Sequence, residues 1–232
     1  MVALLFIGAA VPAMATVVYD TALVSPGVYY GTGNSNSNFT VSTNGTVELG
    51  LGVINRFIGP VDPGAGSNTY MVSTGTNGGG LALWDYVLSI NTRAGGGTQT
   101  VSTDGDVYSL TVKDNTTSVS ITGNPLLIGD NAENGSSTTH LLALSSVWGA
   151  QNAENPGFPG VGLFPNFNPY AADSYTVTLN MVDPTNSANN VSVSENINAQ
   201  TPEPGSLAMM GGGLLGIGFV LRRRFGQSQR KQ

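Results

Sequence analysis

The chain has 232 residues, no cysteine and only 9% charged residues, and its formal net charge is −6 at pH 7. The lack of cysteine excludes a disulfide framework, a thiolate metal site and a cysteine nucleophile. Up to Ser206 there are three basic residues against 14 acidic ones, a net charge of −11, which excludes nucleic-acid binding because nothing there could neutralise phosphates.

The first fifteen residues have the features of a signal peptide. Val2–Val11 is apolar, a proline follows, and Ala13 and Ala15 form the small-x-small pattern that signal peptidase cleaves. Cleavage after Ala15 would give a mature chain that begins at Thr16. No lysine or arginine precedes Arg56, so the usual basic stretch is missing, and we expect the true start codon to lie upstream.

Residues 16–183 predict one all-β ectodomain, an antiparallel, jelly-roll-like β-sandwich. Valine, tyrosine and leucine recur with a period of two, and Gly, Asn, Asp and Pro separate the runs. A spacer is expected at 184–201, because its apolar content falls. We expect strands near residues 16–20, 28–30, 39–51 (a hairpin), 69–73, 81–90, 98–103, 106–113, 119–121, 174–183 and, within the spacer, 191–193, with a further apolar segment at 138–148.

The register of the first hairpin can be predicted from its turn. A two-residue loop at Asn44-Gly45 would place Val41 opposite Glu48. A three-residue loop, 43–45, pairs Val41 with Val47 and Phe39 with Leu49, which keeps one face apolar. We therefore expect the three-residue loop.

A three-stranded meander is expected next. A two-residue turn at Asp104-Gly105 pairs Val101 with Tyr108. A further turn near Asn115-Thr116 sets Val112 opposite Val119 and Leu110 opposite Ile121.

Candidate catalytic and metal sites are few. His140 is the only histidine, and nothing near it resembles a nucleophile elbow. No pair of acidic residues stands out on neighbouring strands, so glycoside hydrolysis is disfavoured. We expect no enzyme, no cofactor and no metal. Weak calcium candidates are Asp104 and Asp106 around a turn glycine and Asp130 with Glu133, although turns favour the same residue types.

Aromatic residues provide the best candidate for a ligand site. The segment 151–170 interleaves prolines with Phe158, Phe164, Phe167 and Tyr170, so it predicts an irregular loop. Exposed rings beside Asn and Asp can stack on sugars, and the alternative is that these rings cover the edge of the sandwich.

The C-terminal region has three parts in a fixed order. Pro202-Glu203-Pro204 is followed by an apolar run, which predicts a helix over about 206–221, and then by Arg222, Arg223 and Arg224. As a helix, the fifteen residues of the apolar run Leu207–Leu221 would reach about 22 Å, less than the ~30 Å of a bilayer core. The arginines place one end of the run at a membrane surface.

This region, residues 202–224, resembles the PEP-CTERM sorting signal of exported proteins of Gram-negative bacteria. The basic tail at 225–232 departs from the pattern, because such signals usually end soon after the arginines. The resemblance implies export, transient retention in the inner membrane, recognition and cleavage by an exosortase, and delivery to the cell surface or extracellular matrix. An ordinary C-terminal transmembrane anchor is the alternative.

Together, these features predict an exosortase-processed envelope or matrix protein with a structural or adhesive role. Its expected partners are signal peptidase, the exosortase and, transiently, the inner membrane. A carbohydrate-binding module that retains exopolysaccharide is the alternative function, and a polysaccharide hydrolase is the less favoured third.

Overall fold

A computed structural model describes residues 15–24, 37–102, 105–129, 132–133, 145–158 and 167–201. Two short 3-10 helices, η1 (Pro125–Leu127) and η2 (Ser187–Asn189), accompany the strands. The strands of these residues are β1 (Thr16–Thr21), β2 (Phe39–Thr43), β3 (Glu48–Asn55), β4 (Gly59–Pro60), β5 (Thr69–Ser73), β6 (Trp84–Asn91), β7 (Val107–Asp114), β8 (Ser120–Gly123), β9 (Ala132–Glu133), β10 (Gly149–Glu154), β11 (Asp173–Val182) and β12 (Val191–Gln200).

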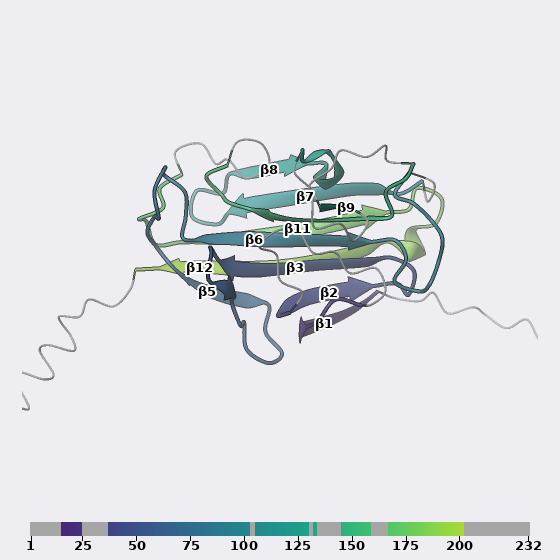
Figure 1. The fold of residues 1–232 in the computed structure, drawn as a ribbon, viewed down its shortest axis with the longest axis horizontal. Coiled ribbons are helices and arrows are strands. Elements are labelled where there is room, and N and C mark those ends of the chain that lie inside the picture. The colour runs from purple at the N-terminus through teal and green to yellow at the C-terminus, as the bar shows by residue number, and fades with distance from the viewer. Residues whose placement is uncertain are drawn as a thin grey trace, which may run out of the picture. The chain divides into compact units, whose positions relative to one another are not determined.

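The strands form two facing sheets (Figure 1). Sheet A has the order β1-β2-β3-β6-β10-β9, with β4 paired to β3, and sheet B has the order β5-β12-β11-β7-β8. All pairs are antiparallel except β5 with β12, which is parallel. The prediction of an all-β fold built from two sheets is confirmed. Residues 1–14 of the predicted signal peptide and the predicted C-terminal helix lie outside the described residues, and the described part contains no helix long and apolar enough to cross a membrane.

The main core lies between the sheets, because alternate side chains of each strand point inward. Sheet A contributes residues such as Leu49, Leu51 and Leu88, and sheet B contributes Leu110 and Leu179, all of them fully buried. A second, smaller cluster consists of Leu23, Phe39, Val41, Ile54 and Val87, with Ala153 against it. Sheet A is therefore apolar on both of its faces.

The predicted register of the β2–β3 hairpin is wrong. Val41 pairs with Gly50 and Thr43 with Glu48, so the connection has four residues, 44–47, rather than three. The Asn44 side chain accepts hydrogen bonds from the backbone N–H groups of Thr46 and Val47, at 2.9 Å each, which stabilises the longer turn. The prediction failed because it required a single apolar face, whereas both faces are buried.

Glycine makes this register sterically acceptable. A Cβ atom added to Gly50 would lie 2.6 Å from Leu23 Cδ2 and 3.0 Å from Phe39 Cδ1, and one on Gly52 would lie 3.4 Å from the same Phe39 carbon. The two glycines thus provide the space that the Phe39 ring occupies. Glycine inside a strand often marks such a close approach.

The predicted meander is also wrong in two respects. Residues 98–102 form no strand, and the Val101 N–H donates to the Val147 carbonyl at 2.8 Å rather than pairing with Tyr108. The β7–β8 hairpin does form, but Val112 lies opposite Ile121 instead of Val119. Asp114 accepts hydrogen bonds from two N–H groups of the turn, at 2.8 Å each, and this lengthens the loop by two residues. Because the shift is even, the inward residues keep their face.

The last strand is much longer than the predicted short strand at 191–193. β12 runs to Gln200 through ten residues of the region expected as a spacer, and it alternates buried and partly exposed positions along its whole length. One compact unit ends at Gln200, and residues 201–232 form a second unit.

Candidate functional site

Many of the predicted site residues lie outside the described part of the chain. These are the sorting residues Pro202, Glu203 and Pro204, the arginines Arg222, Arg223 and Arg224, the signal residue Ala13, the aromatic residue Phe164, the calcium candidates Asp104 and Asp130, and His140. Ala15, Phe158, Phe167, Tyr170, Asp106 and Glu133 are described. The described part ends at Thr201, one residue after β12.

A cation–aromatic stack occupies one end of sheet A. The guanidinium of Arg56 lies 5.1 Å from the ring centroid of Phe57 and 5.1 Å from that of Phe158. Arg56 Nε is also 3.8 Å from a carboxylate oxygen of Asp85, whose side chain is almost buried. The predicted ligand residue Phe158 thus covers an arginine of the fold, a contact that favours the cation electrostatically.

The buried side-chain amide of Asn155 holds Asp85, the carboxylate beside Arg56, in position. The Asn155 side-chain NH2 donates to Asp85 Oδ1 at 2.6 Å and to the carbonyls of Ala82 and Trp84, while its oxygen accepts from the N–H groups of Ala82 and Gly157. Burial raises the pKa of Asp85, and the Asn155 hydrogen bond and the Arg56 charge act in the opposite direction. Donors and acceptors of Asn155 are fully used, which indicates a structural role.

The other two described aromatic candidates differ in exposure. Phe167 packs against the main core, with its ring centroid 6.5 Å from that of Tyr175, and Tyr175 in turn lies 5.5 Å from Trp84. Tyr170 is 64% exposed, on a turn in which its N–H donates to the Asn168 side chain. Of the three described candidates, Tyr170 therefore presents the most accessible ring for a ligand.

The described calcium candidates do not lie on one element. Asp106 precedes β7 in sheet B, whereas Glu133 belongs to β9 in sheet A and is 2% exposed. Within the described ranges no group of three or more acidic or histidine side chains could hold a metal ion.

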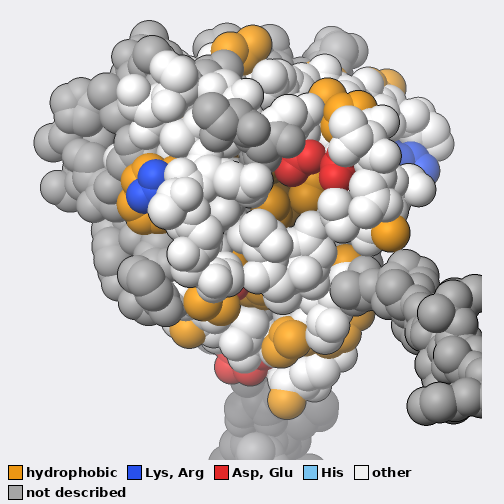
Figure 2. Space-filling view, turned by 90° about the vertical axis from the view of Figure 1, so that its right-hand side faces the viewer, with side chains coloured by type: hydrophobic (Ala, Val, Ile, Leu, Met, Phe, Trp, Pro, Cys, Tyr) orange, Lys and Arg blue, Asp and Glu red, His pale blue; other side chains and the backbone are white. Residues whose placement is uncertain are grey.

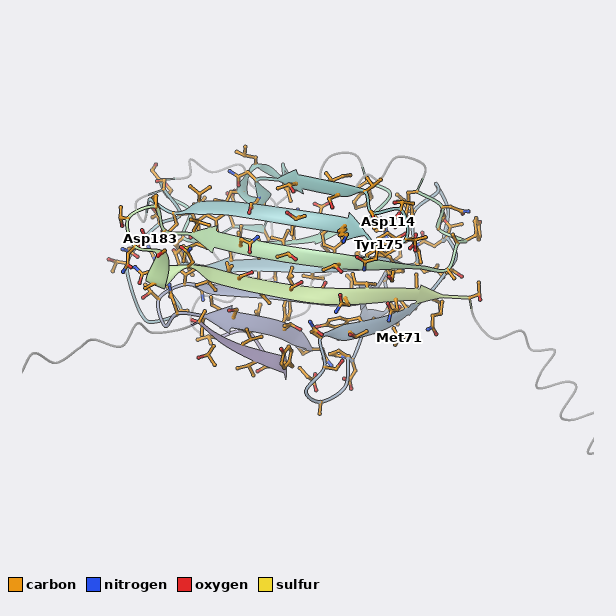
Figure 3. All side chains as sticks on the ribbon, turned by 180° about the vertical axis from the view of Figure 1, so that it is seen from behind. Met71, Asp114, Tyr175 and Asp183 are labelled. Carbon is orange, nitrogen blue, oxygen red and sulfur yellow. The ribbon has the colours of Figure 1, made fainter. Side chains whose placement is uncertain are left out.

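The loop between β11 and β12 closes the end of sheet B where Figure 3 labels Asp183, far from Tyr175 and Asp114. The Asp183 carboxylate accepts hydrogen bonds from the hydroxyl and N–H of Thr185, from the Asn186 N–H and from the Asn189 side chain, at 2.6–2.9 Å. The Thr185 and Asn189 side chains are the main reason that the pKa of Asp183 falls to about 2. This loop orders the β11–β12 connection.

One polar group that the sequence analysis missed lies in the main core. Glu195, in the middle of β12, is fully buried, and neither carboxylate oxygen has a hydrogen-bond partner in the described residues. Burial raises its pKa well above the ordinary value, so the neutral acid is favoured. The Val-x-Val-x-Glu-x-Ile alternation from Val191 to Ile197 contained the signal, because it places Glu195 on the apolar side.

Figure 2 shows the right-hand end of Figure 1, and few charged side chains are visible among the described residues on this face. Its hydrophobic and charged groups are scattered rather than gathered into a single patch. Such a surface agrees with the low charged fraction of 9%.

Comparison with known protein families identifies a PEP-CTERM protein-sorting motif at residues 200–224. The chain therefore carries the signal that its C-terminal sequence predicted. Neither the curated proteins nor the solved structures compared with the chain gave a match.

Proposed function

We propose that this protein, which its PEP-CTERM motif marks as exported, exosortase-targeted and directed to the cell surface, has a structural or adhesive role in the envelope or extracellular matrix. In this proposal it carries no catalytic activity. The chain is held transiently in the inner membrane by its C-terminal segment and is then released to its final location by the exosortase.

The observation that carries the proposal is the direct continuation of β12 into the sorting motif. The strand ends at Gln200, and the motif begins at that residue. β12 is bonded on both sides, through nine residue pairs with β11 and five with β5. Tension applied at the C-terminus therefore acts along a strand that must shear from two neighbours at once, which suits a module that bears load.

The N-terminal end agrees with export of an intact domain. β1 begins at Thr16, the first residue after the predicted signal-peptidase site at Ala15. Cleavage there would leave every residue of β1 in the mature protein.

A host that contains an exosortase tests this role. We expect the wild-type chain to appear in the matrix fraction without its C-terminal segment, and deletion of the gene to weaken the matrix under shear. A Glu203→Ala variant should remain in the membrane fraction and fail to restore cohesion, with Glu133→Gln, far from the motif in sequence, as the control. Unchanged matrix mass and cohesion in the deletion strain would reject the structural role, although sorting would stand.

Carbohydrate binding is the second candidate, and the exposed ring of Tyr170 supports it. An aromatic face beside an Asn side chain can stack on and hydrogen-bond a sugar. Binding of the exported protein to a glycan array should disappear in Tyr170→Ala and persist in Phe167→Leu, because Phe167 packs inward. A flat array for the wild-type protein would remove this candidate.

A further inference from the structure

The turn between β3 and β4 presents two large apolar side chains to solvent. Phe57 and Ile58 are each 86% exposed, more than any other large hydrophobic residue of the described part. The hairpin is tight, because Asn55 pairs with Gly59 and the Ile58 N–H donates to the Asn55 carbonyl at 3.0 Å. A short, well-anchored turn therefore holds an apolar pair at its tip.

The backbone of this tip is also unusual. Phe57 has a φ of +62°, the left-handed region that favours glycine or asparagine. A bulky residue in this conformation is strained, and strain of this kind concentrates at functional sites. The Arg56 guanidinium lies 5.1 Å from the centroid of the Phe57 ring, and this contact leaves the Phe57 side chain largely exposed. Exposure and strain are independent observations, and both indicate that the apolar tip has a partner.

The tip lies at the end of the sandwich from which the chain continues to the sorting motif. Asn55 at the end of β3 pairs with Trp84, the Trp84 ring contacts Tyr175, and Tyr175 pairs with Ile197 near the end of β12. In Figure 1 both β3 and β12 end on the left.

The length of chain beyond β12 identifies the partner. Six residues, 201–206, separate Gln200 from the apolar run that begins at Leu207, and six extended residues span about 20 Å. While that run is held in a bilayer, this end of the sandwich must remain close to the lipid surface. We propose that the Phe57–Ile58 tip inserts into the lipid surface and orients the exported domain on the membrane before the exosortase acts.

This inference rests on the proposed function, in which the C-terminal segment holds the chain in the membrane. Two side chains bind a bilayer weakly on their own, but a short tether gives them a high effective concentration at the surface. A lipid surface also fits the chemistry better than a sugar, because the turn offers an aliphatic residue beside the ring and its one hydrogen-bonding side chain, Arg56, already contacts Asp85 and Phe158.

The experiment uses the full-length chain reconstituted into vesicles of phosphatidylethanolamine and phosphatidylglycerol at 3:1. Because the chain has no cysteine, Ile58→Cys can be labelled uniquely with an environment-sensitive fluorophore. The matched control is Leu127→Cys, an exposed apolar residue of η1, which follows a strand running away from the tip end. We expect blue-shifted emission at position 58 and quenching by lipids spin-labelled near the headgroup, with neither effect at position 127.

Flotation of the vesicles separates the two proposals. If the chain floats and the label at position 58 stays in water, the tip inference is overturned and membrane retention stands. If the chain does not float, both are overturned. A blue shift that depends on protein concentration without vesicles would assign the tip to self-association and also overturn the lipid assignment.

A second variant separates insertion from folding. Phe57→Asn suits a positive φ, so we expect unchanged or raised thermal stability together with loss of the blue shift at position 58. If Phe57→Asn left the shift intact, the Phe57 ring would not be the inserting group and the proposal would fail.

Discussion

Strands β11 and β12 are neighbours of equal length, ten residues each, and they bury alternate side chains in the same way. In β11 the inward residues are Tyr175, Val177, Leu179 and Met181, all of which suit an apolar core. In β12 the third inward residue is Glu195, directly opposite Val177. The same backbone geometry thus places a methyl-bearing side chain on one strand and a carboxyl group on the next.

The difference shows that β12 keeps its place in sheet B although one of its inward side chains is a carboxyl group. β11 satisfies the alternation rule by itself. β12 is bonded to β11 and β5 on its two sides, and these neighbours impose burial on Glu195. A buried carboxyl without a partner destabilises the folded state unless it becomes neutral. β12 is also the strand that continues into the sorting motif, so its stability bears on the proposed function.

The largest expected change in stability is in β11, whose inward residues are all apolar. Leu179→Ala removes a fully buried side chain between Leu110 and Val193, and we expect the free energy of unfolding to fall by about 2–5 kcal/mol, because a cavity remains. Urea denaturation measures it. Val182→Ala, at a position 44% exposed at the end of the same strand, is the control and should change little. Equal losses would mean that the core does not lie where the two sheets meet.

The second effect has the opposite sign. Glu195→Met keeps the length of the side chain and removes a buried polar group that has no hydrogen-bond partner among the described residues, so we expect stability near neutral pH to rise by about 1–3 kcal/mol. Thermal denaturation of the exported protein would measure this gain. A loss of stability would show that Glu195 has a polar partner in the folded protein.

The third effect is the pH dependence of stability. Burial raises the pKa of Glu195 in the folded state above its value near 4.5 in the unfolded state, so the folded protein binds the proton more tightly. The contribution of Glu195 protonation to the free energy of unfolding is fully present below pH 4.5 and is lost as pH rises through the folded-state pKa. Between these two pH values it falls by about 1.4 kcal/mol per pH unit. Urea midpoints measured across this window should fall as pH rises.

Glu195→Gln is the control, because it cannot titrate and should flatten this part of the profile. Burial also raises the pKa of Glu48 and of Asp85, so a weaker slope of the same sign should remain in the variant. Asp183 acts in the opposite sense, since its pKa is lowered to about 2 and its contribution is lost only as pH falls through that value. An identical profile for wild type and Glu195→Gln would contradict the assignment.

The contrast between β11 and β12 also explains which parts of the fold could be predicted. Alternation of apolar and polar residues located β11, β5 and β1 closely, because each pattern is local. The register of β2–β3 and the length of β12 were predicted wrongly, because the first depends on the fit of Phe39 over Gly50 and the second on pairing with β5, more than 100 residues earlier.

The candidate sites divide in a similar way. The sorting motif could be predicted because its residues are contiguous. By contrast, the stack of Arg56 and Phe158 depends on contacts between distant strands, which no local pattern contains, whereas the alternation along β12 does place Glu195 on the buried side. The exposed pair at 57 and 58 also escaped prediction, because an apolar dipeptide after a strand normally indicates its continuation.

The smallest expected effect lies on the outer face of the same two strands. Thr178 pairs with Ser194 next to the Val177–Glu195 pair, and their hydroxyl oxygens are 3.0 Å apart. A double-mutant cycle of Thr178→Ala and Ser194→Ala should give a coupling energy of about 0.2–1 kcal/mol, because this bond competes with water on a partly buried face. Together with the Leu179→Ala and Glu195→Met measurements, this coupling energy compares the outer and inner faces of the β11–β12 pair. If it exceeded the loss in Leu179→Ala, hydrogen bonding on the outer face rather than apolar burial would be the principal interaction between β11 and β12.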